Sequence, residues 1–459
     1  MDPAHAHAHA HPQGVVVSSR TRRALIAATI GIAAVVVGWM LVIGFGTDVD
    51  TDESGLLANE VFEAVVVGVT TGPCEGTTPE SGIDCRFVEV RLTQGPDDGD
   101  TRTLSFSADA PSTPDLGPGD RVVVDHVGGA APGFDYQYAD RQRRPVLIGA
   151  AILFAVAVVA LGRLRGLAAL GGIVVSLAVI LQFVLPAILD GHSAVLVAVL
   201  GSAAIAYVAL YLAHGFTMLT TVALLGTLTS LGLTVVLSAI FTALGDFSGY
   251  ASEEAVLLQQ LAGGVDVSGL VLGGIVIGAL GALDDVTVTQ VSAVAELRRA
   301  NPTMSHGALY RSGLRIGRDH IASTVNTLAL AYAGAALPVM LLFVLSQQSL
   351  GTVANSEVIA TEIVRALVGS VGLVASVPIT TWLASRVVVS ADATEPRHAA
   401  ADDQRAAPPA PAQPGREPGE APDEAGDAPG RGAARRGARP RRRGRDGPPD
   451  DPGERSFWS

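Results

Sequence analysis

Two adjacent carboxylates, Asp284 and Asp285, interrupt an apolar stretch that runs from residue 269 to residue 295. An ionised carboxylate at the centre of a membrane helix costs at least ~2.5–3.5 kcal/mol, so such a group is protonated or faces polar partners or water. A carboxyl group in this setting can take up a proton or a cation and release it when its access to water alternates. The pair is therefore our first candidate for an ion site; the alternative is that it caps the helix at a loop.

A polar stripe continues from this pair toward the C-terminus. Asp285, Thr289, Ser292 and Glu296 are spaced i, i+4, i+7 and i+11, which places them on one face of a helix. We therefore expect Asp284, Asp285, Thr289 and Ser292 to line one polar site within the membrane.

Three glycines precede the pair on the same side of the predicted helix: Gly274, Gly278 and Gly281. Small residues at this spacing let a second membrane helix approach at backbone distance. We therefore predict that another helix packs against this one at these three positions.

A second polar face is expected on the next membrane helix. An amide in hydrocarbon needs a hydrogen-bond partner, so Asn326, with Thr327 beside it, is predicted to complete the ion site. Charged groups near the start of this helix are expected to set the electrostatic potential at the cytoplasmic mouth of the site: Arg315, Arg318, Asp319 and His320.

Composition indicates the class of protein that positions these residues. Charged residues make up only 16% of the chain, and apolar runs long enough to cross a bilayer, about 20 residues each, lie between them. We predict an all-α polytopic membrane protein with about eight transmembrane helices and a small all-β extracytoplasmic domain between the first and second spans. The predicted spans are 24–44, 145–162, 167–189, 193–213, 217–244, 267–290, 321–346 and 360–388.

Residues 50–140 form the one sizeable soluble segment between the predicted spans. β-branched runs separated by Gly and Pro turn signals predict about five short strands in a small barrel or sandwich. The chain's two cysteines, Cys74 and Cys85, both fall in this segment. In an oxidising compartment they are expected to pair and to stabilise the domain by ~2–3 kcal/mol. Two free thiols are the alternative.

The distribution of arginine predicts the orientation, because cytoplasmic loops are enriched in basic residues. With the N-terminus inside, the inner loops include Arg163, Arg165 and Arg311, whereas the outer loop 245–266 is acidic. Eight spans then place both termini in the cytoplasm and the cysteines outside a bacterial inner membrane. We expect the first span to be an uncleaved anchor, with a cleaved signal peptide as the alternative.

Both ends of the chain are polar and of low complexity. Residues 1–23 alternate histidine with alanine before three arginines, and residues 391–459 are rich in Pro, Ala, Gly and Arg. Such segments cannot bury a core, so we predict disordered cytoplasmic tails. A short extended tail gives its histidines no fixed geometry, so no metal site is predicted.

Two long motifs resemble the YibE/F-like family of bacterial membrane proteins. They are residues 278–297, which contain the aspartate pair, and residues 315–334 with the Leu-Pro pair that follows. Residues 162–167 are similar as well, and the likeness extends over about residues 56–390. The resemblance implies an extracytoplasmic domain followed by a permease-like membrane domain, for which we expect seven helices over 145–390. It implies no substrate and brings no catalytic residues.

Two functions of different classes remain open. A permease or secondary transporter would use Asp284 or Asp285 to carry a coupling proton or cation. A non-transporting assembly or secretion accessory would bind a partner through its outer domain, with the aspartates holding helices or a partner subunit. Gly245 and Asp246 are only loosely similar to an aspartyl-protease motif, so no enzyme is expected. We expect no cofactor and no nucleic acid; the predicted partners are membrane lipids and a second copy or another membrane subunit.

Overall fold

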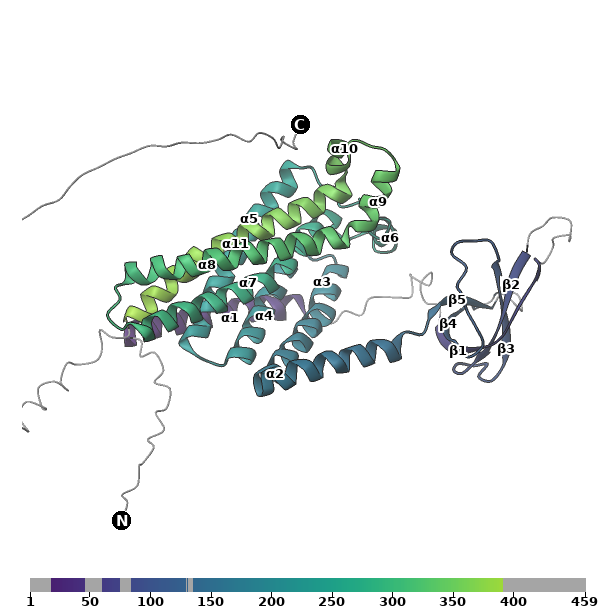
Figure 1. Cartoon of the computed structure of the whole chain (residues 1–459), viewed down its shortest axis with the longest axis horizontal. Helices are drawn as coiled ribbons and strands as arrows, with labels where there is room; N and C mark the ends of the chain where they lie inside the picture. The colour runs from purple at the N-terminus through teal and green to yellow at the C-terminus, as the bar shows by residue number, and fades with distance from the viewer. Residues whose placement is uncertain (1–17, 46–59, 75–83, 129, 131–134, 391–459) are drawn as a thin grey trace, which may run out of the picture. The chain divides into compact units, whose positions relative to one another are not determined.

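The computed structural model describes residues 18–45, 60–74, 84–128, 130 and 135–390. Within these residues one helix, α1 (Ser19–Ile43), precedes a five-stranded β domain, and the other helices follow it (Figure 1). The predicted C-terminal tail and most of the predicted N-terminal tail lie outside the described residues. The strands are β1 Glu60–Pro73, β2 Asp84–Leu92, β3 Thr101–Ser107, β4 Arg121–His126 and β5 Tyr136–Arg141.

The five strands form one antiparallel sheet in the order β3-β2-β1-β4-β5. β1 is long enough to pair with β4 along its first half and with β2 along its second half. A register shift between Val66 and Gly68 interrupts the ladder there, and such a bulge bends and twists a strand. The result is a half-barrel with a single sheet, so of the two predicted architectures the sandwich is wrong.

One face of this sheet carries the core of the domain. Alternate residues of the strands, such as Val88, Val90 and Leu92 of β2, are buried because successive side chains of a strand point to opposite faces. Cys74 and Cys85 form a disulfide that joins the end of β1 to the start of β2. Gly72 of β1 lies opposite Cys85 in the ladder, so pairing of the two strands brings the two sulfurs together.

Arg102 and Tyr136 form a charged cluster at the edge of the β domain. The Arg102 guanidinium makes ion pairs with Asp97, Asp100 and Asp135 at 3.1–3.3 Å. The Tyr136 hydroxyl donates a hydrogen bond of 3.0 Å to Asp97. Burial of the Tyr136 side chain, followed by its bond to the Asp97 carboxylate, raises the pKa of the phenol to about 12. The phenolate is therefore disfavoured in the folded domain.

The raised pKa of Tyr136 predicts alkaline destabilisation of the β domain. At pH values below about 10 the phenol is protonated in both states; between about 10 and 12 only the folded state retains the proton. The free energy of unfolding should therefore fall across this window, by on the order of 2–3 kcal/mol. Tyrosinate absorption measured against pH for the wild type and for Tyr136→Phe gives the titration of Tyr136 by difference. The midpoint of this titration should lie near pH 12. A midpoint near the ordinary value of about 10 would contradict the prediction.

The helical domain contains six helices that are long and apolar enough to cross a membrane, or up to seven if one bent pair counts as a single span; these counts refer to the described residues. The helices are α1 Ser19–Ile43, α2 Arg144–Val179, α3 Leu185–Leu189, α4 Ala194–His214, α5 Met218–Leu244, α6 Glu253–Leu261, α7 Val267–Ala300, α8 His306–Ala335, α9 Leu337–Leu345, α10 Leu350–Asn355 and α11 Glu357–Ser390. The predicted spans agree with these helices in position, whereas the count of eight stays a prediction.

The helical stretch Arg144–Leu189 counts as one of the six. A straight helix of its 46 residues would be about 69 Å long, twice the thickness of a bilayer core. Arg163, with φ 51° and ψ −130°, breaks α2. A Cβ on Gly166 would collide with the carbonyl oxygen of Val158, so the chain doubles back at this point. In Figure 1 one arm of α2 follows β5 and the other leads into α3. These arms correspond to the predicted spans 145–162 and 167–189.

Two other predicted spans differ from the observed helices. The span predicted at 321–346 is divided between α8 and α9, which are bent by 59°. Pro338 lies in the first turn of α9, where a missing N–H is tolerated but a continuous helix is not. The span predicted at 267–290 continues as α7 to Ala300, and α8 already begins at His306. The polar last turns of α7 and the polar first turns of α8 are therefore helical as well.

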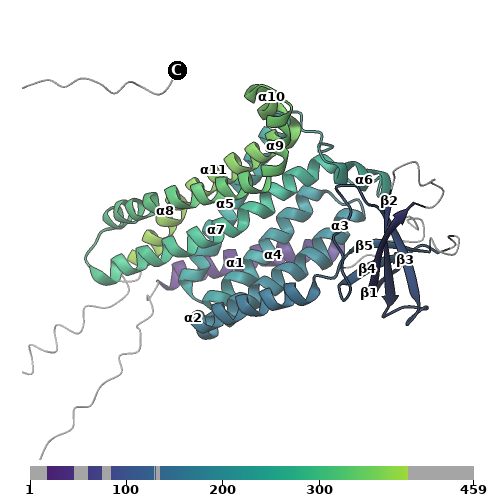
Figure 2. The same ribbon diagram turned by 45° about the vertical axis from the view of Figure 1, so that its right-hand side comes forward.

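Helices α5, α7 and α11 form the centre of the helical domain and pack against one another, and α8 packs on α7 and α11 (Figures 1 and 2). Gln290 of α7 is buried, and its amide nitrogen donates to the carbonyl oxygen of Gly313 at 2.8 Å and to the hydroxyl of Thr381 at 2.7 Å. Gly313 and Gly317 bring α8 close, since a Cβ on Gly317 would collide with Val377 of α11. One amide thus connects three helices.

Candidate functional site

Helix α7 carries the aspartate pair and begins after Asp266, whose carboxylate caps it by accepting the N–H of Gly269 at 2.9 Å. In both views α7 lies between α4 and α8 (Figures 1 and 2). One face of α7 is exposed along most of its length, and this face comprises Gly274, Gly278, Gly281, Asp285, Thr289, Ser292 and Glu296. The other faces are buried against α4, α5 and α11. The exposed face joins the glycines and the polar stripe predicted from the sequence.

The predicted packing of a helix backbone onto the three glycines is wrong within the described chain. A Cβ on Gly281 would meet no atom within 4 Å. At Gly274 and Gly278 the neighbours are the ends of long side chains, Arg365 Nη2 at 3.7 Å and Tyr332 Oη at 3.0 Å from the Cβ position. Gly274 and Gly278 are therefore covered by the ends of polar side chains and do not contact the backbone of another helix.

The close helix approach occurs one residue away, at Gly273. A Cβ there would lie 3.1 Å from Ala198 Cβ and 3.3 Å from the carbonyl oxygen of Ala194, both on α4. Adjacent residues of a helix point in directions that differ by about 100°, so Gly273 and Gly274 lie on different faces of α7. The glycine run in the sequence contains both, and only the tertiary packing distinguishes them.

Asp284 is half-buried, and its Oδ1 is buried without a hydrogen-bond partner among the described residues. The carboxyl group also interacts with the hydroxyl of Thr227 on α5. Thr227 and Thr287 lie 2.7 Å apart, oxygen to oxygen, and both are fully buried. Asp284 therefore has the buried hydroxyls of Thr227 and Thr287 on one side and open space on the other. The side chain of Asp285, by contrast, is 70% exposed.

A pocket of about 700 Å³ opens beside the two aspartates, between α2, α4 and α7. We call it the carboxylate pocket. Apart from the Asp284 and Asp285 side chains, its walls are largely apolar, with Ser176 and His214 as further polar lining residues. A carboxyl group with one unpartnered buried oxygen in such a pocket can bind a proton or a cation.

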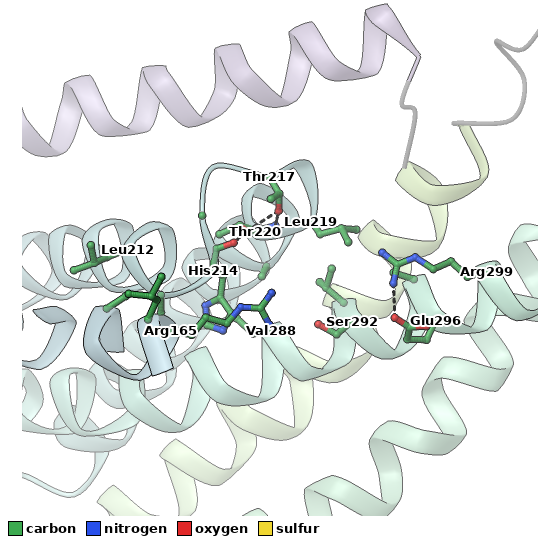
Figure 3. A pocket seen from close by; sticks show the side chains of 17 residues that line it. Arg165, Leu212, His214, Thr217, Leu219, Thr220, Val288, Ser292, Glu296 and Arg299 are labelled. Carbon is green, nitrogen blue, oxygen red and sulfur yellow. Dashed lines mark hydrogen bonds and ion pairs between the residues drawn. The ribbon is translucent and has the colours of Figure 1, made fainter. Parts of the chain in front are cut away.

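A second pocket of about 650 Å³ lies further along α7, and we call it the basic pocket (Figure 3). Its charged lining residues are Arg165 of α2, His214 of α4, and Glu296 and Arg299 of α7, and the last two form an ion pair. Ala213, His214 and Val288 line both pockets. The two pockets therefore adjoin along one side of α7.

The residues predicted on the following helix are placed differently. His320 Nε2 lies 3.9 Å from Asp285 Oδ2, which is within ion-pair distance when the imidazole is protonated but too far for a hydrogen bond. Asn326 and Thr327 are exposed, and neither lines the carboxylate pocket or the basic pocket. Neither residue therefore lies in the pocket beside the aspartates, and their part in an ion site stays a prediction. Gly317 faces the bundle, and Asn326 follows about two and a half turns later, so it points the opposite way.

The charges at the mouth of the pockets are also different from those predicted. Arg315, Arg318 and Asp319 are exposed on α8, and none of them lines either pocket. Arg165 and His214 do so instead, although no pattern in the sequence connects α2 and α4 to the aspartates. Arg165 stands out in the sequence only as a basic residue in the turn between two apolar runs.

A further ion pair was missed in the sequence because it lies inside a predicted span. Arg365 and Glu362 of α11 pair at 2.6 Å, and the Arg365 guanidinium lies 6.0 Å from the centroid of the Tyr332 ring. Two opposite charges three residues apart in an apolar run are the signal that could have identified it. No group of three or more His, Cys, Asp or Glu side chains in the described part of the chain could hold a metal ion.

Comparison with known proteins gives one match. A family model described as YibE/F-like protein matches residues 150–390, more than half of the chain. No curated protein and no solved structure matches. The matched region contains both pockets and all of α4, α5, α7 and α8, whereas the β domain precedes it. The chain belongs to the YibE/F-like family.

Proposed function

We propose that this protein is a permease of the bacterial cell membrane in which Asp284 and Asp285 carry a proton or cation that is coupled to movement of a solute. The observation that carries the proposal is the buried, unpartnered Oδ1 of Asp284 at the wall of the carboxylate pocket. Carboxylates inside membrane domains are rare and most often belong to ion or proton pathways. The proposal assigns no catalytic residue and no cofactor.

The proposed path follows the exposed face of α7. Asp285 is open to the pocket, whereas Asp284 lies deeper against Thr227. A proton taken up by Asp285 would reach Asp284 and neutralise it, which lowers the cost of moving the carboxyl group into apolar surroundings. A shift of α7 relative to α2 and α4 would then change which side of the membrane the pocket faces.

We further propose eight spans with both termini in the cytoplasm. The two arms of α2 count as separate spans and α8 with α9 counts as one, which adds two to the six. The Cys74–Cys85 disulfide supports a location of the β domain outside the cytoplasm. A cysteine introduced at Gln260, in the exposed part of α6, should react with an impermeant maleimide in intact cells. Reaction only after permeabilisation would refute this orientation.

The two aspartates should be needed for coupled flux. In proteoliposomes that report internal pH, a solute that drives proton entry through the wild type should drive none above the protein-free level through Asp284→Asn or Asp285→Asn. The matched control is Asp190→Asn, which removes an exposed carboxylate at the end of α3. Flux in the aspartate variants equal to that of the control would exclude the proposed coupling.

A second candidate is a non-transporting assembly or secretion accessory. It is favoured by the exposure of Gly281 and its neighbours on α7, because a polar and glycine-rich face does not suit contact with lipid. A second copy or another membrane subunit could cover this face. If the aspartate variants lost association with such a partner and no flux were found for the wild type, the accessory function would replace the permease.

A further inference from the structure

The basic pocket has two basic side chains, Arg165 and His214, that pair with no described residue. Arg165 lies just after the turn at Arg163, and His214 ends α4; both side chains reach into the pocket (Figure 3). Within the described residues, neither the Arg165 guanidinium nor the His214 ring makes a hydrogen bond or an ion pair. Arg299, by contrast, is paired with Glu296, so that this carboxylate does not neutralise the other two groups.

The N-terminus of α5, which follows His214 after a short turn, also lines the basic pocket. This helix spans 27 residues and begins after Thr217, whose hydroxyl accepts the N–H of Thr220 at 3.1 Å. The first turn of a helix carries a partial positive charge, which falls off within that turn. Thr217, Thr220 and Ser292 also line the pocket. The hydroxyls of Thr217 and Thr220 hydrogen-bond to each other at 2.8 Å, whereas the Ser292 hydroxyl makes no hydrogen bond within the described residues. Hydroxyl donors, a helix N-terminus and basic side chains are the groups that hold oxyanions in proteins.

We propose that the basic pocket binds the phosphate group of an anionic ligand, which is either free phosphate or the headgroup of a phospholipid. The volume of about 650 Å³ leaves room for a phosphate together with an attached organic group. Arg165 supplies a positive charge, His214 a ring N–H, and Ser292 a hydroxyl. The pocket adjoins the aspartates through Ala213, His214 and Val288.

The position of the basic pocket next to the aspartates links the bound anion to the proposed permease. The substrate class named below rests on that proposed function. A phosphate bound at His214 would lie in the pocket next to Asp284. Entry of a proton at Asp284 would reduce the repulsion between the carboxylate and the anion as the anion moves along α7. The substrate class would then be a phosphate or phosphorylated solute that moves together with a proton.

Binding of inorganic phosphate to the full-length protein in phosphatidylcholine nanodiscs tests the proposal. We expect Arg165→Gln and His214→Gln each to weaken binding by about tenfold or more, since each removes a hydrogen bond to a charged group. Arg165→Lys retains the charge and should bind more tightly than Arg165→Gln. Arg311→Gln is the matched control: it removes an exposed arginine of α8 that lines neither pocket.

Phosphate binding measured in nanodiscs that contain phosphatidylglycerol distinguishes free phosphate from a phospholipid headgroup as the ligand. If free phosphate is the ligand, phosphate binding in these nanodiscs stays at the level found in phosphatidylcholine. If a lipid headgroup is the ligand, phosphatidylglycerol displaces phosphate from the wild type, and this displacement is lost in Arg165→Gln and in His214→Gln. The proposal is refuted if neither probe binds the wild type better than Arg165→Gln, or if Arg311→Gln weakens binding equally. Asp284→Asn should still bind phosphate, so a failure of coupling and a failure of anion binding are distinguishable.

Discussion

Replacing Gly317 with leucine is expected to detach α8 from the helix bundle. A Cβ at this position would collide with Val377 of α11 and would lie 2.8 Å from Oε1 of Gln290. Gln290 cannot move aside without losing its hydrogen bonds to Gly313 and Thr381. Overpacking costs about 1–3 kcal/mol even where neighbours can shift, so we expect a loss of about 3 kcal/mol or more here.

The thermal stability of the detergent-solubilised full chain, followed by size-exclusion chromatography after heating, measures this effect. Gly334→Leu is the matched control, because it makes the same change on the same helix where a Cβ would meet no atom within 4 Å. Leucine favours a helix over glycine by about 1 kcal/mol, so the control should not be less stable than the wild type. If Gly317→Leu melted at the same temperature as Gly334→Leu, the close packing of α8 on α7 and α11 would be refuted.

Loss of the disulfide is expected to have the second large effect, and it should be confined to the β domain. The bond joins cysteines 11 residues apart, and closing a loop of this size constrains the unfolded chain by about 3 kcal/mol. Among the described residues of the domain the core has only ten buried members, so little other stabilisation compensates. Cys85→Ser in the full chain should therefore make the domain sensitive to proteolysis at temperatures where the wild type resists.

Two comparisons keep this second experiment specific. Reduction of the wild type should reproduce the sensitivity of Cys85→Ser, and the double substitution of both cysteines should add nothing further. The helical domain should melt as in the wild type in every case. If the reduced and oxidised proteins resisted proteolysis equally, the disulfide would have no role in stability.

Much of the fold could be predicted because it depends on local patterns. The helices α4 and α5 begin and end within one residue of the predicted spans 193–213 and 217–244, since apolar runs bounded by capping residues define such helices. The extension of α7 to Ala300 was missed, because tertiary contacts decide whether a polar turn stays helical.

The candidate site could be predicted only in part. The sequence identifies Asp284 and Asp285, because two acids in an apolar run are costly wherever they lie. It does not identify Arg165 or His214, which come from other helices and carry no spacing relation to the aspartates. It also does not show that Asn326 points away from both pockets, because the direction in which a helix faces depends on the helices packed against it, as Val377 of α11 packs against Gly317.

The order of residue types along the chain is therefore enough to specify the composition of each helix, the membrane character of the chain and the pair of acids. Local composition and periodicity are sufficient for these properties, since burial in lipid or protein follows from the residue types. Only the tertiary structure decided that Arg165, His214 and Asp284 line adjoining pockets. The rotation and approach of α2, α4 and α7 depend on contacts between residues far apart in the chain, and no local pattern records them.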